Sequence, residues 1–333
     1  MKTIFIIGNG RSGTTMLGRI LNNNSEVHTF PEIHFFEQLW SKADTERKLT
    51  VPTGVELCSL ILNISSEGYF SKRHLSDFKN EADLIIENSE LTGLEVYKKV
   101  LEYETIRNKK NISCKQTPQN VFYVKEILSS FPESKFIFLI RDPRAVMLSQ
   151  KNKWQRKFLG GKHAGWFETV RAWFNYHPFT IGKLWNAAFL AGIKFKNDRR
   201  FLVVKFEDLI NTPESTVNEI CNFLNIKYDK EMLEVPQVGS SIGKDIAEKK
   251  GIRKDRIESW KGGGLNKSEL YICEKICRIN MNSVGYNLMK LKMPLFGLLF
   301  YALIFPFKIT GALILNLHRM KNIFETIKKR LAS

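Results

Sequence analysis

The chain has 333 residues and a formal net charge of +17, because 51 Lys and Arg stand against 34 Asp and Glu. Its hydrophobic fraction of 43% and charged fraction of 26% are typical of a globular protein and exclude a disordered or fibrous chain. The basic excess indicates an anionic partner, and its scattered distribution argues against nucleic acid. Five widely spaced cysteines predict reduced thiols in a cytosolic protein rather than disulfides or a zinc site.

The N-terminal stretch, residues 3–21, predicts a strand, a glycine-rich turn and a helix. The apolar run 4–7 is typical of a buried strand, Gly8 and Gly10 end it, and apolar residues then recur at helical spacing. This geometry aims backbone N–H groups and a helix N-terminus at one point, which favours phosphate or sulfate. We expect no signal peptide, since the strand begins at residue 3. The predicted anion-binding residues of the turn are Arg11, Ser12, Gly13, Thr14 and Thr15.

The spacing from Gly8 to Gly13 is that of a nucleotide-binding P-loop with one change. The Lys that nucleoside triphosphatases place before the Ser or Thr is replaced by Thr14, and a cation stands inside the loop as Arg11. Kinases and ATPases use that Lys together with Mg²⁺ to neutralise the β- and γ-phosphates. The changed loop therefore predicts transfer of a monoanionic group that needs no metal.

Strands and helices alternate along the rest of the chain, which predicts an α/β fold with a P-loop-type parallel sheet flanked by helices on both faces. Residues 41–90 have the weakest pattern, and we expect acceptor recognition there. The expected strands after the first are near 25–34, 112–114, 135–140 and 201–205. The expected helices are 55–62, 92–108, 121–128, a helix from Pro143, 213–224 and 270–281, together with a long aromatic-rich helical region over 166–192 and a loop-like segment at 236–264.

A second candidate anion site follows the strand 135–140. Arg141 ends this strand and can form a bidentate fork to a phosphate. Ser149 lies about two helical turns further on, and Lys153 lies one turn beyond it on the same face. Taken alone, this segment could also be a strand end capped by an Asp-Pro turn.

The two anion sites together resemble the sulfotransferases that use 3′-phosphoadenosine 5′-phosphosulfate (PAPS), over most of residues 3–286. The pattern is most similar to bacterial carbohydrate-type and tyrosylprotein sulfotransferases. The resemblance implies that the Arg11 loop binds the 5′-phosphosulfate and that Arg141 and Ser149 hold the 3′-phosphate. It also implies a late nucleotide-binding loop over 251–264, whose candidate residues are Arg253, Trp260 and Lys261. A Tyr that the family often has is replaced here by Phe206.

The resemblance also suggests catalytic residues. Tyrosylprotein enzymes have a catalytic Glu 21 residues after the loop Arg, and that spacing from Arg11 leads to Glu32. The cytosolic enzymes use a His, which makes His34 the reserve base. A base is needed because an alcohol is a poor nucleophile until its proton is removed. Lys115 is a candidate for the family's Lys-Thr-Pro cation, but it stands one residue too early, so an ordinary surface position is an equal alternative.

The C-terminal residues 289–333 are expected to be a separate apolar and basic tail after a sulfotransferase domain of residues 1–288. The stretch 293–307 is uncharged and 309–317 is nearly as apolar, but Pro306 and Lys308 interrupt the run. As a helix, the stretch 293–307 would be about 20 Å long, which is less than the thickness of a bilayer's hydrocarbon core. Basic residues on both flanks favour an in-plane or re-entrant anchor on the cytoplasmic leaflet over a single pass. Packing as a buried hairpin or an oligomer contact is the alternative.

The sequence thus predicts a PAPS-dependent, metal-independent sulfotransferase on the cytoplasmic face of a membrane, with a saccharide or lipid-linked saccharide acceptor, as in surface polysaccharide synthesis. Two rivals remain. A P-loop kinase should have kept a Lys at position 14 and a Mg²⁺-binding Asp, for which Asp142 is the only near fit. A non-catalytic membrane-surface protein with a relic loop would have an eroded second anion site.

Overall fold

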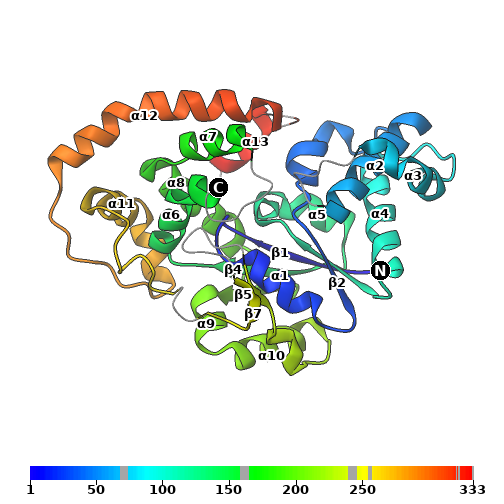
Figure 1. Ribbon diagram of the computed structural model, residues 1–333, viewed down its shortest axis with the longest axis horizontal. Helices are drawn as coiled ribbons and strands as arrows, with labels where there is room; N and C mark the ends of the chain where they lie inside the picture. The colour runs from blue at the N-terminus through cyan, green and yellow to red at the C-terminus, as the bar shows by residue number, and fades with distance from the viewer. Residues whose placement is uncertain are drawn as a thin grey trace.

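The computed structural model describes residues 1–67, 74–157, 165–238, 246–253, 257–319, 321 and 323–331. Within these residues, a central sheet of five parallel strands has the order β2-β3-β1-β4-β5 (Figure 1). The predicted parallel sheet is confirmed. The strands are β1 (Lys2–Gly8), β2 (Val27–Phe30), β3 (Ile112–Gln116), β4 (Lys135–Ile140) and β5 (Phe201–Lys205).

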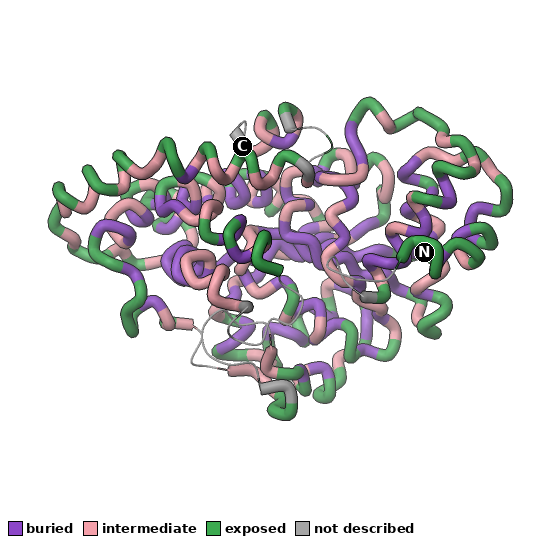
Figure 2. The backbone as a smooth tube through the Cα atoms, turned by 45° about the horizontal axis from the view of Figure 1, so that its top comes forward, coloured by how far each residue is buried: buried purple, intermediate pink, exposed green. Residues whose placement is uncertain are grey.

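The middle strand β1 is covered by helices on both faces, which is why it is apolar almost throughout. Phe5 belongs to a core cluster on one face, whereas Ile4 and Ile6 belong to a cluster on the other. Buried backbone is concentrated along the sheet (Figure 2). Parallel strands end at one edge, so the segments after β1, β2, β3, β4 and β5 all emerge at the edge where this type of fold binds ligands.

The helices pack on both faces of the sheet, as expected (Figure 1). The longer ones are α1 (Thr14–Asn22), α2 (Val51–Glu67), α3 (Lys79–Ile86), α4 (Gly93–Arg107), α5 (Val124–Ser130), α6 (Pro143–Lys151), α7 (Trp166–Phe174), α8 (Pro178–Ile193), α9 (Phe206–Asn211), α10 (Pro213–Leu224), α11 (Lys267–Ser283), α12 (Leu295–Asn316) and α13 (Ile323–Leu331). Shorter segments are η1 (Phe35–Leu39), η2 (Lys42–Asp44), η3 (Leu75–Phe78), η4 (Pro118–Tyr123), η5 (Lys153–Lys157), η6 (Lys230–Leu233), η8 (Leu317–Arg319) and the antiparallel pair β6 (Pro236–Gln237) and β7 (Ile246–Lys250).

The structure refines one sequence expectation for local structure and corrects two others in detail. The helical region predicted over 166–192 is confirmed and consists of two helices, because Pro178 lacks an N–H and fits only the first turn of a helix, here α8. The segment 236–264 is not wholly loop, since β6 and β7 pair within it. The helix predicted at 121–128 begins as the 3-10 segment η4 and becomes α-helical only at Val124.

The C-terminal segment lies along the rest of the protein. Helix α12 runs over α7, and α13 then returns to the domain (Figure 1). Among the described residues, α12 alone is long and apolar enough to cross a membrane, with a mean hydropathy of 2.0. Only 6% of its most apolar stretch is buried, so its outer side faces away from the protein (Figure 2). The domain boundary at 288/289 stays a prediction.

Candidate active site

The loop between β1 and α1 depends on two glycines that other residues could not replace. A Cβ at Gly8 would lie 2.4 Å from the carbonyl oxygen of Leu139, so β1 and β4 could not stay paired there. A Cβ at Gly13 would lie 2.4 Å from the ring of Phe206, and its φ of 95° is one that glycine favours. These close approaches fix the loop against the ends of β4 and β5.

Arg11 connects the two anion-binding motifs. It has a φ of 73°, which is uncommon for a residue with a side chain. Its carbonyl accepts a hydrogen bond of 3.0 Å from Nη1 of Arg141, and its Nε donates one of 2.9 Å to Oγ of Ser149. The fold therefore brings together residues that are 130 and 138 positions apart. Their roles toward a nucleotide stay predictions.

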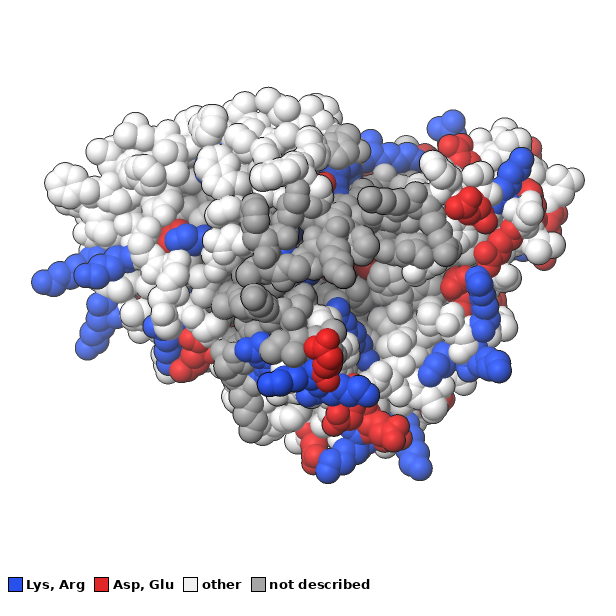
Figure 3. Space-filling view, in the orientation of Figure 1, with Lys and Arg blue, Asp and Glu red and all other residues white. Residues whose placement is uncertain are grey.

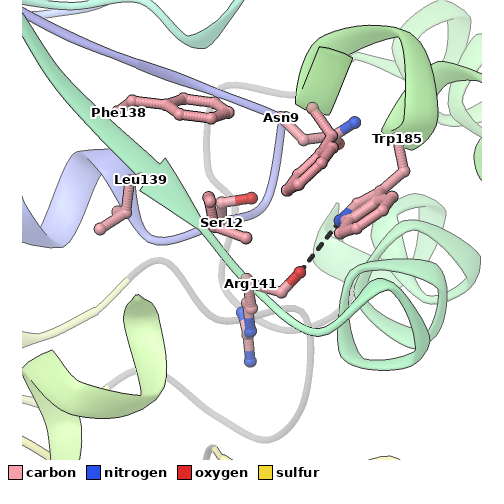
Figure 4. A pocket seen from close by; sticks show the side chains of 8 residues that line it. Asn9, Ser12, Phe138, Leu139, Arg141 and Trp185 are labelled. Atoms are coloured by element: carbon pink, nitrogen blue, oxygen red, sulfur yellow. Dashed lines mark hydrogen bonds between the residues drawn. The ribbon is translucent and has the colours of Figure 1, made fainter. Parts of the chain in front are cut away.

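Ser12 has a buried hydroxyl that points to a ligand. The residue is completely inaccessible, and its Oγ has no hydrogen-bond partner in the described part of the chain. Such a group costs about 1–3 kcal/mol when left unpaired. It lines a small cavity together with Asn9, Arg141 and Trp185 (Figure 4). Of the other loop hydroxyls, Thr14 is buried at the start of α1 and Thr15 is exposed.

Arg141 is held in place from two sides. Its guanidinium carbon lies 4.1 Å from the ring centroid of Phe206, within cation–π distance. Its carbonyl accepts a hydrogen bond of 2.9 Å from the indole of Trp185, in α8 (Figure 4). Phe206 therefore supports both the loop and this arginine, although it lacks the hydroxyl of the family's Tyr. The sequence carried no signal for Trp185, because its contact depends on how α8 packs.

Lys153, in η5, lies in the field of the same site. Burial, followed by the cations Arg11 and Arg171, lowers the pKa of Lys153 to about 8, while the carboxylate of Glu32 opposes this shift. The interaction with Arg11 and Glu32 shows that the predicted cofactor and catalytic residues share one electrostatic environment. Arg171, from α7, is a cation of this environment that the sequence analysis did not identify.

Glu32 and His34 follow β2 and form an ion pair. His34 Nε2 lies 3.5 Å from Glu32 Oε2, and its Nδ1 lies 3.6 Å from Glu37 Oε2. Burial lowers the pKa of His34, but the two carboxylates outweigh it and raise that pKa to about 9. Burial raises the pKa of Glu32, but His34, Lys153 and Arg11 together hold it below its ordinary value. Near neutral pH, Glu32 is therefore a carboxylate that can accept a proton, and His34 is a cation that cannot.

Lys115 is a buried residue of β3 and not a surface lysine. It is 1% exposed, and its Nζ lies 3.3 Å from the ring centroid of Phe30. Burial holds its pKa well below the ordinary value. Its Nζ has no hydrogen-bond partner among the residues that the structure describes. The ordinary surface alternative is thus wrong, and a catalytic role for Lys115 stays a prediction.

The late loop is described only in part, since residues 254–256 lie outside the described residues. Trp260 packs in a small core cluster. The guanidinium carbon of Arg144 lies 3.9 Å from the ring centroid of Trp260. Lys261 is paired with Glu258 at 2.5 Å, and Arg253 is half-buried. The structure gives Trp260 a packing role, and nucleotide contacts from these three residues stay predictions.

Asp142 is engaged in a buried ion-pair network. Its two carboxylate oxygens accept hydrogen bonds from Arg144 at 3.0 and 2.7 Å, and Arg144 also binds Glu274 at 2.8 Å. A carboxylate paired in this way is a poor candidate for the Mg²⁺ ligand of a kinase. Among the described residues, no group of three or more His, Cys, Asp or Glu side chains is placed to hold a metal ion.

The fold and the loop define an α/β protein of the P-loop type, with an anion site built from arginine and hydroxyl side chains. Residues 3–230 match the family described as "Sulfotransferase family". Since this match covers more than half of the chain, the protein belongs to the sulfotransferase family.

Individual relatives are distant. Protein-tyrosine sulfotransferase A of Caenorhabditis elegans is 24% identical over 254 residues, covering 73% of this chain and 54% of that protein. The omega-hydroxy-beta-dihydromenaquinone-9 sulfotransferase of Mycobacterium bovis is 26% identical over 247 residues, covering 67% and 62%. Sulfotransferase 2A6 of Rattus norvegicus is 25% identical over 154 residues, covering 40% and 46%. The chain thus spans about half of the length of the curated relatives it matches.

Among solved structures, the sulfotransferase domain of the Synechococcus PCC 7002 olefin synthase has a TM-score of 0.51 and 18% identity. The similarity covers 87% of this chain and 96% of that domain. At this level of identity the likeness shows a shared fold.

Proposed function

We propose that the protein transfers a sulfuryl group from PAPS to a hydroxyl of a saccharide or lipid-linked saccharide. The observation that carries the proposal is the contact of Arg11 with Arg141 and Ser149 beside the buried, unpartnered hydroxyl of Ser12. Two arginines and two hydroxyls beside the N-terminus of α1 suit the two anionic groups of this co-substrate.

The same residues suggest how the reaction proceeds. Glu32 accepts the proton of the acceptor hydroxyl as the hydroxyl oxygen attacks sulfur. A new sulfur–oxygen bond forms while the bond between sulfur and the phosphate oxygen breaks, and adenosine 3′,5′-bisphosphate leaves. Arg11 and Lys153 stabilise the negative charge that develops on the leaving oxygen. Glu32 can take this role because its lowered pKa keeps it ionised near neutral pH, and its side chain, 39% exposed, is open to an acceptor.

Thermal unfolding in the presence of nucleotides tests the proposal. At a concentration of about 100 times its Kd, adenosine 3′,5′-bisphosphate should stabilise the protein by about 2.7 kcal/mol. Adenosine 5′-monophosphate, which lacks the 3′-phosphate, should stabilise it much less at the same concentration. Stronger stabilisation by ATP with Mg²⁺ would instead favour the kinase alternative.

A membrane-carried acceptor is supported by the two sides of α12. The inner side carries its polar groups: Lys308 Nζ donates to the carbonyl of Trp173 at 2.9 Å, and the carbonyl of Tyr301 bonds Nε2 of His177 at 3.0 Å. The outer side carries exposed apolar residues at helical spacing. They include Phe296, Leu299, Phe300, Leu303, Phe307 and Ile314.

Helix α7 extends this apolar surface. It exposes Trp166, Phe167, Val170 and Trp173, and it packs directly against α12. In Figure 3 the upper left of the molecule, over α12, is white, whereas charged residues gather along the bottom and right. A contiguous exposed apolar patch is typical of a surface that contacts a membrane or another protein.

Contacts at both ends of α12 favour an in-plane anchor over a membrane-crossing helix. Before the helix, the N–H of Met289 donates to Glu274. At its C-terminal end, Asn316 donates to Asn175 at 2.8 Å, and beyond the helix Arg319 pairs with Glu168 at 3.6 Å. Both ends are thus tied to one side of the domain, as in a monotopic protein on the cytoplasmic leaflet. The relative named for a hydroxylated dihydromenaquinone supports an acceptor carried in the lipid phase.

Flotation with vesicles of mixed neutral and anionic lipid tests the anchor. Phe296→Asp should weaken binding about tenfold or more, because inserting a Phe side chain contributes about 1.5–3 kcal/mol. Leu84→Asp is the matched control, since Leu84 is 73% exposed but belongs to α3. Equal effects of the two substitutions would refute the anchor.

A further inference from the structure

A chain of ion pairs links the candidate base to the C-terminal helix. Glu32 contacts His34 at 3.5 Å, His34 contacts Glu37 at 3.6 Å, and Glu37 forms an ion pair with Arg330. Burial increases from Glu32, with 39% of its side chain exposed, to Glu37, with 8% exposed. Glu37, the most buried carboxylate of the chain of ion pairs, therefore has two cationic partners: His34, which precedes it in the sequence, and Arg330 from α13.

Helix α13 is fixed by other contacts, so Arg330 does not depend on Glu37 alone for its position. Lys329 forms an ion pair with Glu126 and lies 4.5 Å from the ring centroid of Tyr123. Thr326 is 3% exposed. Just before α13, Lys321 pairs with Asp44 at 2.7 Å. The helix thus packs over the segment that follows β2 and presents Arg330 to it.

The charges in this chain depend on one another. Burial raises the pKa of Glu37, but Arg330 and His34 together lower it to about 2. An ionised Glu37 in turn helps to keep His34 protonated. The charged groups that face Glu32 are His34, Lys153 and Arg11, and Tyr123 faces Glu37 as a neutral phenol.

We propose that Glu37 and Arg330 are positioning residues that act through His34 to orient Glu32 and keep it ionised. This inference rests on the proposed function, in which Glu32 takes the proton of the acceptor. His34 is then a cationic clamp and not a reserve base. The C-terminal helix is part of the transfer machinery, because without Arg330 the buried Glu37 loses its outer partner.

Titration of the His34 ring by NMR in the full chain tests the first link without any acceptor. In the wild type the pKa of His34 should be near 9. In Glu37→Gln it should fall by at least about one unit, because one of the two carboxylates that raise it is lost. In Lys329→Met it should not change, since Lys329 pairs with Glu126. A pKa near 9 in Glu37→Gln would overturn the proposal.

The pH dependence of kcat tests the link to Glu32. Glu37→Gln should move the alkaline limb of the kcat profile to lower pH, because His34 then loses its proton about one pH unit earlier. In that pH range kcat should fall by about 10- to 100-fold, as for a misplaced catalytic group. The KM for PAPS should stay within about twofold, because Arg11, Arg141 and Ser149 are untouched. A fall in kcat that is equal at every pH would mean a merely structural role and would overturn the proposal.

A double-mutant cycle tests the role of α13. Arg330→Met should shift the same limb of the kcat profile in the same direction as Glu37→Gln, but by less, and Arg330→Lys should restore most of the wild-type profile. In the Glu37→Gln background, Arg330→Met should cause no further shift. Any effect of Lys329→Met on kcat should be the same in the wild-type and the Glu37→Gln backgrounds. Additive effects of Arg330→Met and Glu37→Gln would overturn the link. A wild-type protein that transfers no sulfuryl group would refute the proposed function instead, while the His34 titration would still decide the first link.

Discussion

Replacing Arg11 by Ala should separate catalysis from folding. The side chain donates a hydrogen bond to Ser149, and the residue is half-buried. Ala at a φ of 73° meets the same steric strain as Arg, so the substitution adds little backbone cost. The carbonyl that accepts from Arg141 is retained. The free energy of unfolding should therefore fall by only about 1 kcal/mol, the value of a typical hydrogen bond.

The expected loss of activity is much larger. Arg11 is the cation inside the loop, and removal of one transition-state donor lowers kcat by about 10²–10³-fold, which corresponds to about 2.7–4 kcal/mol. The melting temperature should move by only about 2–4 °C for a chain of this size. The contrast between the two effects distinguishes a transition-state role from a structural one.

Single-turnover transfer of labelled sulfuryl from PAPS, measured beside thermal unfolding, gives both quantities. Arg19→Ala is the matched control, because Arg19 lies in α1 and donates to the carbonyl of Val238 at 2.9 Å. The control should lose stability similarly but keep kcat within about threefold, as expected of a residue outside the reacting centre. Near-normal turnover by Arg11→Ala, or equal losses in both variants, would refute the assignment of the loop as the reacting centre.

Other substitutions test the remaining parts of the site. Arg141→Ala should raise the KM for PAPS more than Ser149→Ala, because its contact is charge-assisted, and unchanged preference for the 3′-phosphorylated nucleotide would remove both from the cofactor site. Glu32→Gln should keep nucleotide binding in thermal shift and lose transfer by about 10²-fold or more; an active variant would reassign the base. The contacts of protonated His34 with Glu32 and Glu37 should add about 3 kcal/mol to the free energy of unfolding. Because the pKa of His34 is raised in the folded state, this contribution should be fully present below pH 6.5 and be lost as pH rises through about 9. His34→Gln should remove this pH dependence of unfolding. Deleting residues 289–333 should release the protein from vesicles and lower sulfuryl transfer, while adenosine 3′,5′-bisphosphate should still bind. Loss of nucleotide binding would instead mean that the tail is part of the core.

The sequence alone determined the architecture and the anion-binding motifs, because both depend on local patterns. Alternating apolar strands and helices specify a parallel sheet, and the glycines around Arg11 specify a loop at the end of its first strand. The spacing of Arg141 and Ser149 on a strand end and a helix is also local. Each of these signals is carried by residues close together in the chain.

Tertiary structure decided which of these residues meet and what charge they carry. Lys308 interrupts an apolar run in the sequence, but in the fold it points inward to Trp173 and leaves the outer side of α12 apolar. Lys115 is buried, and His34 is a cation, because their pKa values depend on neighbours that the chain brings from elsewhere. The pairing of Glu37 with Arg330 spans 293 residues. Electrostatic contacts of this range have no local sequence pattern, so only the packed fold specifies them.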